Sequence, residues 1–347
     1  MAIKVLVIDD SAMIRKVFEQ ELNKDPQIEV VGTAPDPFVG RDMIVKLKPD
    51  VITLDIEMPR MDGLTFLSKL MKYYPIPVVI VSSLAKRGGD VALKAMELGA
   101  VEVLSKPGTA YSVGDMSEQL IEKVKAASLV RVHKRDNSVI SPVHSAGSVI
   151  STASLGIKTT DKIFAIGSST GGTEALREVI TKFPMNCPPT VVVQHMPQNF
   201  TKSFAERLNS LSSVEVKEAT DNERLSIGKV LIAPGNLHME IRRRGIEYFV
   251  TLFDGPMVFH QRPAVEILFN SVAQYAGQNA VGAILTGMGE DGAQGLLNMR
   301  NAGANTIAQD EKTSVVFGMP KKAIELGAAQ VVKPLNEIAQ TMLDFCK

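Results

Sequence analysis

The strongest constraint on the fold is a repeated alternation of short apolar runs with amphipathic, helix-like stretches. Over the first 125 residues or so, such stretches separate five apolar runs, a pattern typical of an α/β unit. These runs are mostly apolar, as in parallel strands that are buried on both faces. We therefore predict a five-stranded parallel sheet in a doubly wound fold. The runs are Ile3–Ile8, Glu29–Thr33, Val51–Leu54, Val78–Val81 and Val101–Leu104.

A second series of strand-like runs begins after Lys162 and predicts a second α/β domain. Segment Glu240–Leu252 differs from the others, because it has the pattern of two strands that reverse direction around Arg244-Gly245. We therefore expect a doubly wound, mostly parallel sheet with an antiparallel hairpin at its edge. The other runs are Ile163–Ile166, Thr190–Val193, Lys229–Ala233, Ala280–Leu285 and Asn305–Ala308.

The segment between the two series lacks sustained apolar periodicity and contains recurring serines. This composition is typical of a flexible linker. The expected organisation is therefore one domain over residues 1–125, a linker over residues 126–160 and a second domain over residues 161–347.

Composition excludes several kinds of partner. The 38 basic and 38 acidic side chains cancel, so non-specific attachment to nucleic acid is not expected. No apolar run reaches about 18 residues, so no membrane insertion is expected. The only cysteines, Cys187 and Cys346, lack metal-ligand spacing, and the N-terminus enters a strand without a signal-peptide pattern. These features favour a cytoplasmic protein.

Three carboxylates follow strands of the first domain. Asp9 and Asp10 come after the first strand and Asp55 after the third, and the carboxyl ends of parallel strands meet at one sheet edge. Such a cluster is costly unless a cation neutralises it, and oxygen ligands suit Mg²⁺. Ser82 and Lys106 follow the fourth and fifth strands. A carboxylate beside Mg²⁺ and an ammonium group can accept a phosphoryl group.

On these residues, the first domain resembles the flavodoxin-like receiver domains of two-component response regulators. The resemblance implies that Asp55 is phosphorylated and that Asp9, Asp10 and Asp55 hold Mg²⁺. It also implies that Ser82 and Lys106 are the switch residues. Receivers more often have threonine than serine at the position of Ser82, a departure that leaves the hydroxyl chemistry unchanged.

A second candidate site begins at a strand, tight turn and helix formed around Gly167–Gly172. A serine at the apex of such a turn is exposed close to helix amides, which suits a nucleophile. Ser169 is the candidate here, and Ser168 is its neighbour. Glycine-rich turns also bind phosphate or simply reverse the chain, so the motif needs partners.

A serine nucleophile needs a base and an acid that orients the base. His195 follows the strand Thr190–Val193, while His238 and His260 are competitors in later loops. Asp291 follows the strand Ala280–Leu285 within Gly287–Gly292. Ser169, His195 and Asp291 together would support hydrolysis of an ester or amide.

One alternative concerns the same glycine-rich segment, since Gly287–Gly292 has the spacing G-x-G-x-x-G and Asp310 follows it. This spacing is found in dinucleotide-binding loops. However, Glu290 and Asp291 would place two negative charges where a pyrophosphate must bind. The residues therefore favour the hydrolase over the dinucleotide site.

Five motifs from Lys162 to the C-terminus resemble the methylesterase domain of the chemotaxis protein-glutamate methylesterases. The resemblance implies a Ser169, His195 and Asp291 triad that removes methyl groups from glutamate γ-methyl esters of chemoreceptors, with possible deamidation of receptor glutamines. The backbone amides of Thr170 and Met288 are candidates for the oxyanion hole, and no cofactor is expected in this site. The motifs are Gly167–Gly172, Gln194–Pro197, Ala233–Gly235, Asp254–Pro256 and Leu285–Gly292.

A receiver joined to this domain implies control by phosphorylation. The expected phosphodonor is the chemotaxis histidine kinase, and the expected substrate is the cytoplasmic part of the chemoreceptors. We expect the unphosphorylated receiver to restrain the esterase. The main alternative is a receiver-controlled, DNA-binding transcription regulator, and a further one is a peptide-binding scaffold. The large, mixed-charge second domain, whose densest basic cluster is Arg242–Arg244, disfavours DNA binding.

Overall fold

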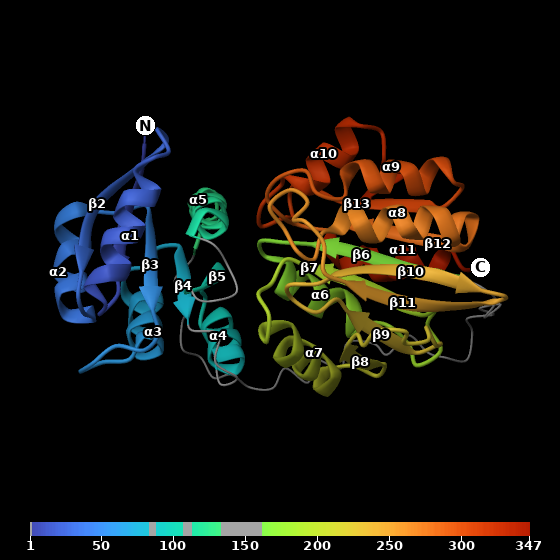
Figure 1. Ribbon diagram of the computed structural model, residues 1–347, viewed down its shortest axis with the longest axis horizontal. Coiled ribbons are helices and arrows are strands. Elements are labelled where there is room, and N and C mark those ends of the chain that lie inside the picture. Colours follow the sequence, from blue (N-terminus) through green and yellow to red (C-terminus); the bar gives the residue numbers. More distant parts are fainter. Residues whose placement is uncertain (1, 83–87, 107–112, 133–161) are drawn as a thin grey trace. The chain divides into compact units, whose positions relative to one another are not determined.

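The computed structural model describes residues 2–82, 88–106, 113–132 and 162–347 (Figure 1). The chain divides into two compact units, Met1–Ser141 and Pro142–Lys347. Most of the expected linker lies outside the described residues. Its first three residues, 126–128, belong to the last helix of the N-terminal unit, because the apolar stripe of that helix continues through Ala127. No helix among the described residues has both the length and the apolar character needed to cross a membrane.

The N-terminal unit is built on a parallel sheet with the strand order β2-β1-β3-β4-β5. Its strands are β1 (Ile3–Ile8), β2 (Ile28–Ala34), β3 (Val51–Asp55), β4 (Val78–Ser82) and β5 (Glu102–Ser105). Its helices are α1 (Ala12–Leu22), α2 (Pro37–Leu47), α3 (Gly63–Tyr73), α4 (Gly88–Glu97) and α5 (Val113–Ser128). The predicted five-stranded parallel sheet is therefore confirmed.

Helix starts in this unit follow from side-chain caps. Ser11, Asp36 and Asp62 each accept a backbone N–H of the helix that follows, which satisfies a donor that has no partner within the helix. Helices α1 and α5 pack together on one face, where Phe18, Leu22 and Leu120 share a core with the strands. Helices α3 and α4 contact each other. The sheet is thus covered on both faces, which explains why most residues of its strands are apolar.

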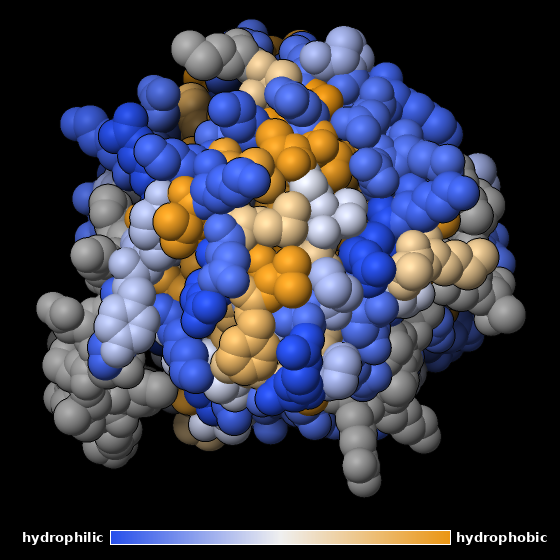
Figure 2. Space-filling view, turned by 90° about the vertical axis from the view of Figure 1, so that its left-hand side faces the viewer, coloured by the Kyte–Doolittle hydropathy of each residue, from blue (hydrophilic) through white to orange (hydrophobic). Residues whose placement is uncertain are grey.

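Helix α2 keeps part of its apolar surface in contact with solvent. Phe38, Val39 and Val45 on this helix are exposed, whereas Ile44 is buried. The guanidinium of Arg60, from the loop after β3, lies 5.5 Å from the centre of the Phe38 ring and also pairs with Asp36. Figure 2 shows apolar side chains gathered among polar ones on this side of the N-terminal unit. The outer side of α2 therefore does not contribute to the core of its own unit.

The C-terminal unit contains a seven-stranded sheet with the order β14-β13-β12-β6-β7-β9-β8, and all of its described pairings are parallel. Its strands are β6 (Ile163–Ser168), β7 (Thr190–Gln194), β8 (Glu215–Glu218), β9 (Lys229–Ile232), β12 (Ala280–Ile284), β13 (Asn305–Gln309) and β14 (Val331–Lys333). Its helices are α6 (Gly172–Ile180), α7 (Phe200–Leu211), α8 (Val265–Tyr275), α9 (Ala293–Asn301), α10 (Met319–Glu325) and α11 (Leu335–Asp344), with a 3-10 turn, η1 (Gly277–Asn279).

The expected antiparallel hairpin is present, but it does not form an edge of the main sheet. Strands β10 (His238–Arg244) and β11 (Glu247–Phe253) make a two-stranded sheet of their own. Its buried residues, such as Met239 and Ile241, share a core with Leu268 of α8. Because one face of the hairpin is apolar, it is more stable when packed on a helix than when paired at a sheet edge with that face in water.

The two outermost strands of the main sheet, β8 and β14, were not predicted. Strand β8 has the sequence EVKE, in which only Val216 is buried, and β14 has only three residues. Edge strands are short and partly charged, so neither carries the continuous apolar run that marks an interior strand.

Candidate functional sites

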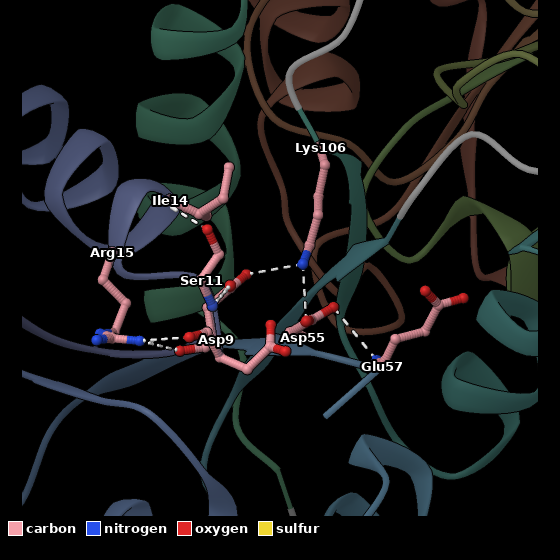
Figure 3. Close-up of polar contacts among 8 residues, drawn as sticks. Asp9, Ser11, Ile14, Arg15, Asp55, Glu57 and Lys106 are labelled. Atoms are coloured by element: carbon pink, nitrogen blue, oxygen red, sulfur yellow. Dashed lines mark hydrogen bonds and ion pairs between the residues drawn. The ribbon is translucent and has the colours of Figure 1, made fainter. Parts of the chain in front are cut away.

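The carboxyl edge of the N-terminal sheet brings Asp9, Asp55 and Lys106 together (Figure 3). Asp9 follows β1, Asp55 ends β3 and Lys106 follows β5. The Lys106 Nζ donates a hydrogen bond to Asp55 Oδ2 at 2.7 Å and pairs with Asp9 Oδ2 at 3.1 Å. Both carboxylates are almost completely buried. The sequence prediction that these strand ends converge is therefore confirmed in the structure.

Burial and neighbouring charge set the proton affinities in this cluster. Burial raises the pKa of Asp55, Lys106 partly opposes this shift, and the charge of Asp9 adds to it. Burial alone would lower the pKa of Lys106, but its hydrogen bond to Asp55 and the charges of both carboxylates raise that pKa overall. The lysine therefore stays charged, whereas burial destabilises the ionised form of Asp55.

Asp10 completes a group of three carboxylates that could hold a cation. One ligand oxygen each from Asp9, Asp10 and Asp55 lies within 4.8 Å of the others, and Asp10 is exposed. Asp9 Oδ2 is buried, and within the described part of the chain the ammonium group of Lys106 at 3.1 Å is its one close partner. Hard oxygen donors with one exposed side fit Mg²⁺, which retains water ligands.

Hydrogen bonds that involve backbone groups hold the loop after β1 in place. Arg15 Nη1 donates to the carbonyl oxygens of Asp9 and Asp10, and the Ser11 N–H donates to Asp9 Oδ1 (Figure 3). Ser82, the last residue of β4, is buried, and its carbonyl accepts the Lys106 N–H at 2.8 Å. Ser82 therefore lies next to the lysine that contacts Asp55.

In the C-terminal unit, the two adjacent serines at the end of β6 have different surroundings. Ser168 is the last strand residue and is fully buried, and its hydroxyl donates to Gln194 Oε1 at 2.7 Å. Ser169 lies in the turn before α6 and is 7% exposed. The turn requires Gly171, whose φ is +77°. Of the two serines, Ser169 is the one in the turn.

His195 and Asp291 form a buried pair. His195 Nε2 lies 2.7 Å from Asp291 Oδ2, and the buried Nδ1 of His195 has no hydrogen-bond partner among the described residues. Asp291 also accepts the N–H groups of Val265 at 2.7 Å and Glu266 at 2.8 Å, the first two residues of α8. These bonds to the start of a helix hold both carboxylate oxygens of Asp291 in place. Sequence reasoning did not find these two amides.

Gln194 is a further buried site residue that sequence reasoning missed. Its Nε2 donates to the carbonyl oxygens of Ser169 at 3.0 Å and His195 at 3.3 Å. The hydroxyl of Ser168 fixes the other end of the amide. A Cβ on Gly172 would lie 2.0 Å from Gln194 Oε1, so glycine is required there. The signal in the sequence was a glutamine side chain directly after the apolar run Thr190–Val193.

Ser169 and His195 therefore occupy equivalent positions on neighbouring strand ends. Ser168 pairs with Gln194 in parallel register, and the His195 N–H donates to the Ser168 carbonyl at 3.2 Å. Neighbouring strands lie about 4.8 Å apart, so the next residues along each strand are close. The structure brings together Ser169, His195 and Asp291, although no hydrogen bond joins His195 to Ser169 in it.

The competing histidines have other surroundings. His238 Nε2 donates to the Pro256 carbonyl at 2.9 Å, and His238 Nδ1 accepts the Ala264 N–H at 3.3 Å. Burial lowers the pKa of His238. With both ring nitrogens bonded to backbone groups, His238 has a structural role. His260 is exposed in the loop before α8.

The glycine-rich segment 287–292 packs directly on the serine turn. A Cβ on Gly287 would lie 2.7 Å from the Ser169 Cβ. Within residues 162–347, no hydrogen bond takes up the N–H of Thr170 or Met288, the two candidate oxyanion donors. Asp310 caps a turn by accepting from Thr313, and Glu290 pairs with Lys322. The segment therefore supports the serine turn, and the dinucleotide interpretation gains no support.

These features are those of a receiver-like α/β unit joined to an α/β unit of hydrolase type. Residues 164–342 match the CheB methylesterase family, and residues 5–116 match the response regulator receiver domain. A protein-glutamate methylesterase/protein-glutamine glutaminase 2 from Syntrophus aciditrophicus is 59% identical over 98% of this chain and 98% of that protein. A protein-glutamate methylesterase/protein-glutamine glutaminase 4 from Anaeromyxobacter dehalogenans is 53% identical over 98% of this chain and 94% of that protein.

A solved structure supports the same assignment for the C-terminal unit. The crystal structure of the CheB methylesterase catalytic domain of Thermotoga maritima aligns with a TM-score of 0.52 and 42% identity, covering 53% of this chain and 98% of that one. The chain therefore belongs to the CheB methylesterase family and carries a response regulator receiver domain. A DNA-binding transcription regulator, the main alternative from the sequence, is not supported, because the domain after the receiver is a methylesterase domain.

Proposed function

We propose that the C-terminal unit hydrolyses γ-methyl esters of glutamate in proteins, with Ser169 as nucleophile, His195 as base and Asp291 as the acid that orients the base. The main support is the buried pair between His195 and Asp291 at 2.7 Å, next to a serine in a strand-to-helix turn. The family and the names of its relatives supply the substrate class.

The proposed mechanism gives separate roles to the two nitrogens of His195. Because Nε2 contacts Asp291, Nδ1 is the nitrogen that accepts the Ser169 proton. Ser169 Oγ then bonds to the ester carbonyl carbon, and the N–H groups of Thr170 and Met288 stabilise the negative oxygen. His195 returns the proton to the leaving methoxide, which departs as methanol. Water, deprotonated in turn by His195, hydrolyses the acyl-serine and restores Ser169.

The same steps apply to a glutamine side chain, where ammonia leaves instead of methanol. Both reactions pass through an acyl-serine that water converts to glutamate, so one site serves both. The names of the relatives include a protein-glutamine glutaminase, which supports this second activity for the chain.

We further propose that Asp55 receives a phosphoryl group from a chemotaxis histidine kinase. Asp9, Asp10 and Asp55 would hold Mg²⁺, which would neutralise charge on the transferred phosphoryl oxygens. Lys106 would pair with a phosphoryl oxygen, since it already contacts Asp55. Ser82 would reorient its hydroxyl toward the new group. The Asp55→Asn chain should take up no phosphoryl group from a radiolabelled donor.

The substrate we propose is the methylated cytoplasmic part of chemoreceptors, which places the protein in the cytoplasm. We also propose residues 1–128, which include all of α5, as the receiver, 129–160 as a linker and 161–347 as the esterase. Unphosphorylated receiver would restrain the esterase, and a coupling of about 1–3 kcal/mol would change its rate by roughly 5–150-fold. A fragment starting near Ser148 should then be faster than the unphosphorylated full chain. Equal or lower activity of that fragment would contradict restraint by the receiver.

Methanol release from methylated chemoreceptor membranes tests the esterase proposal. The native chain should release methanol, and Ser169→Ala should not. Ser210→Ala is a matched control, because Ser210 is an exposed serine on α7 whose hydroxyl contacts only the Arg207 carbonyl among the described residues. Absence of methanol release by the native chain, with or without a phosphodonor, would overturn the proposal.

A further inference from the structure

Two adjacent residues between β11 and α8 have a backbone conformation that L-residues seldom adopt. Phe259 has φ +51° and His260 has φ +57°. Val258 and Gln261 close this turn with two backbone hydrogen bonds of 3.1 and 3.0 Å. Tight turns with two left-handed residues favour asparagine and glycine, because a larger side chain is crowded against its own backbone. The chain keeps an aromatic ring and an imidazole at these positions, and strained residues of this kind cluster at functional sites.

The base of this turn is held firmly. The His238 ring bonds to the Pro256 carbonyl on one limb and to the Ala264 N–H on the other. The Arg262 guanidinium donates to the Gly255 carbonyl and to Asn236 Oδ1, both at 2.6 Å. The turn therefore projects from an anchored base.

That base adjoins the candidate active site. Val265 and Glu266, which hold Asp291, come three and four residues after Arg262. The Asn236 N–H donates to the Arg262 carbonyl. A Cβ on the preceding Gly235 would lie 2.4 Å from the N atom of Gln198, in the loop after His195. At about 3.4 Å per residue, the tip of the turn lies within roughly 10 Å of Arg262. The base of the turn is therefore connected both to the segment that holds Asp291 and to the loop that follows His195.

We propose that the Phe259-His260 turn contacts the polypeptide that carries the methylated glutamate. The inference rests on the proposed esterase function and adds how the protein substrate is recognised. Phe259 is 41% exposed although it is large and apolar, and His260 is exposed beside it. A methyl ester is too small to occupy the site and also reach Phe259, whereas a polypeptide chain is long enough for both. An aromatic side chain has few rotatable bonds, so on an anchored turn it binds such a chain with little loss of conformational freedom.

The test compares two substrates with the full-length chain. One is methylated chemoreceptor membrane, and the other is a glutamate γ-methyl ester blocked at its α-amino and α-carboxyl groups. The variants Phe259→Gly and Phe259→Asn remove the ring while retaining residues that tolerate positive φ. The control is Ile246→Gly, which removes an 85% exposed apolar side chain at the far end of the β10–β11 hairpin.

The ratio of kcat/KM for the receptor to kcat/KM for the small ester should fall about tenfold in both Phe259 variants, as for the loss of an aromatic anchor. The fall should lie mainly in KM for the receptor, and Ile246→Gly should keep the native ratio. A native ratio in both Phe259 variants would overturn the inference while leaving the esterase proposal intact. Failure of the native chain to hydrolyse either ester would instead count against the esterase proposal.

Discussion

The two units place their candidate sites at the same structural position but prepare them in opposite ways. Both sites lie where parallel strands end, and each is built from buried polar side chains, Asp9 and Asp55 in one and His195 and Asp291 in the other. In the N-terminal unit, three carboxylates face a single lysine, so negative charge is in excess. In the C-terminal unit, the one carboxylate is matched by a histidine and two helix amides.

This difference corresponds to the chemistry proposed for each unit. Excess negative charge at Asp9, Asp10 and Asp55 makes a cation favourable, so the site depends on an ion from solution. The Ser169 site has its charges compensated within the protein. Phosphoryl transfer at the first site should therefore respond to metal and pH, and ester hydrolysis should respond mainly to side-chain geometry.

The largest expected effect comes from the two adjacent serines. Ser169→Ala should reduce methanol release by about 10⁴-fold or more, because it removes the nucleophile. Ser168→Ala should cost about tenfold, because it releases only one end of the Gln194 amide. Initial rates of methanol release from receptor membranes measure both. If Ser168→Ala were the inactive variant and Ser169→Ala the active one, the assignment of the nucleophile would be wrong.

Asp291→Asn tests whether charge compensation within the protein matters at the esterase site. The amide keeps the size of the side chain but no longer stabilises a protonated His195, so the rate should fall by about 10³- to 10⁴-fold. Circular dichroism should show a folded protein. A folded Asp291→Asn chain with native activity would remove Asp291 from the site.

Gln194→Met tests how strongly ester hydrolysis depends on side-chain geometry at the C-terminal site. Methionine has a similar volume but cannot bridge the carbonyl oxygens of Ser169 and His195, so we expect about a tenfold loss in kcat with little change in KM. Gln194→Glu is the matched variant, because it retains the acceptor for Ser168 but loses the donor. Native kcat in both variants would show that the bridge does not position the two residues.

The remaining prediction concerns protons and Mg²⁺ at the N-terminal site. Because burial raises the pKa of Asp55, its protonated form is favoured by folding, and this contribution to stability is lost as pH rises through that pKa. Mg²⁺ must displace that proton, so its affinity should fall about tenfold per pH unit below the pKa of Asp55. Titration calorimetry of the full chain at several pH values measures this. If the Mg²⁺ affinity of Asp55→Asn depended on pH as steeply as that of the native chain, the displaced proton would belong to another group.

Most of the candidate site residues could be predicted from their positions at the ends of predicted strands. Asp9, Asp55, Ser169, His195 and Asp291 were all identified because each follows an apolar run, and parallel strands bring their carboxyl ends to one edge. This rule needs only the sequence, since continuous apolar runs mark interior strands. It failed for β8 and β14, whose positions at the sheet edges let them be short or charged.

The amino-acid sequence by itself therefore determined the two α/β folds and the residue types at each sheet edge, because periodicity and strand-end chemistry are local properties. Only the tertiary structure decided which nitrogen of His195 faces Asp291, that Gln194 bridges two strand ends, and that the start of α8 holds Asp291. It also placed the β10–β11 hairpin on α8 instead of at the sheet edge. These outcomes depend on packing between segments 25 to 96 residues apart in the chain, which no local pattern records.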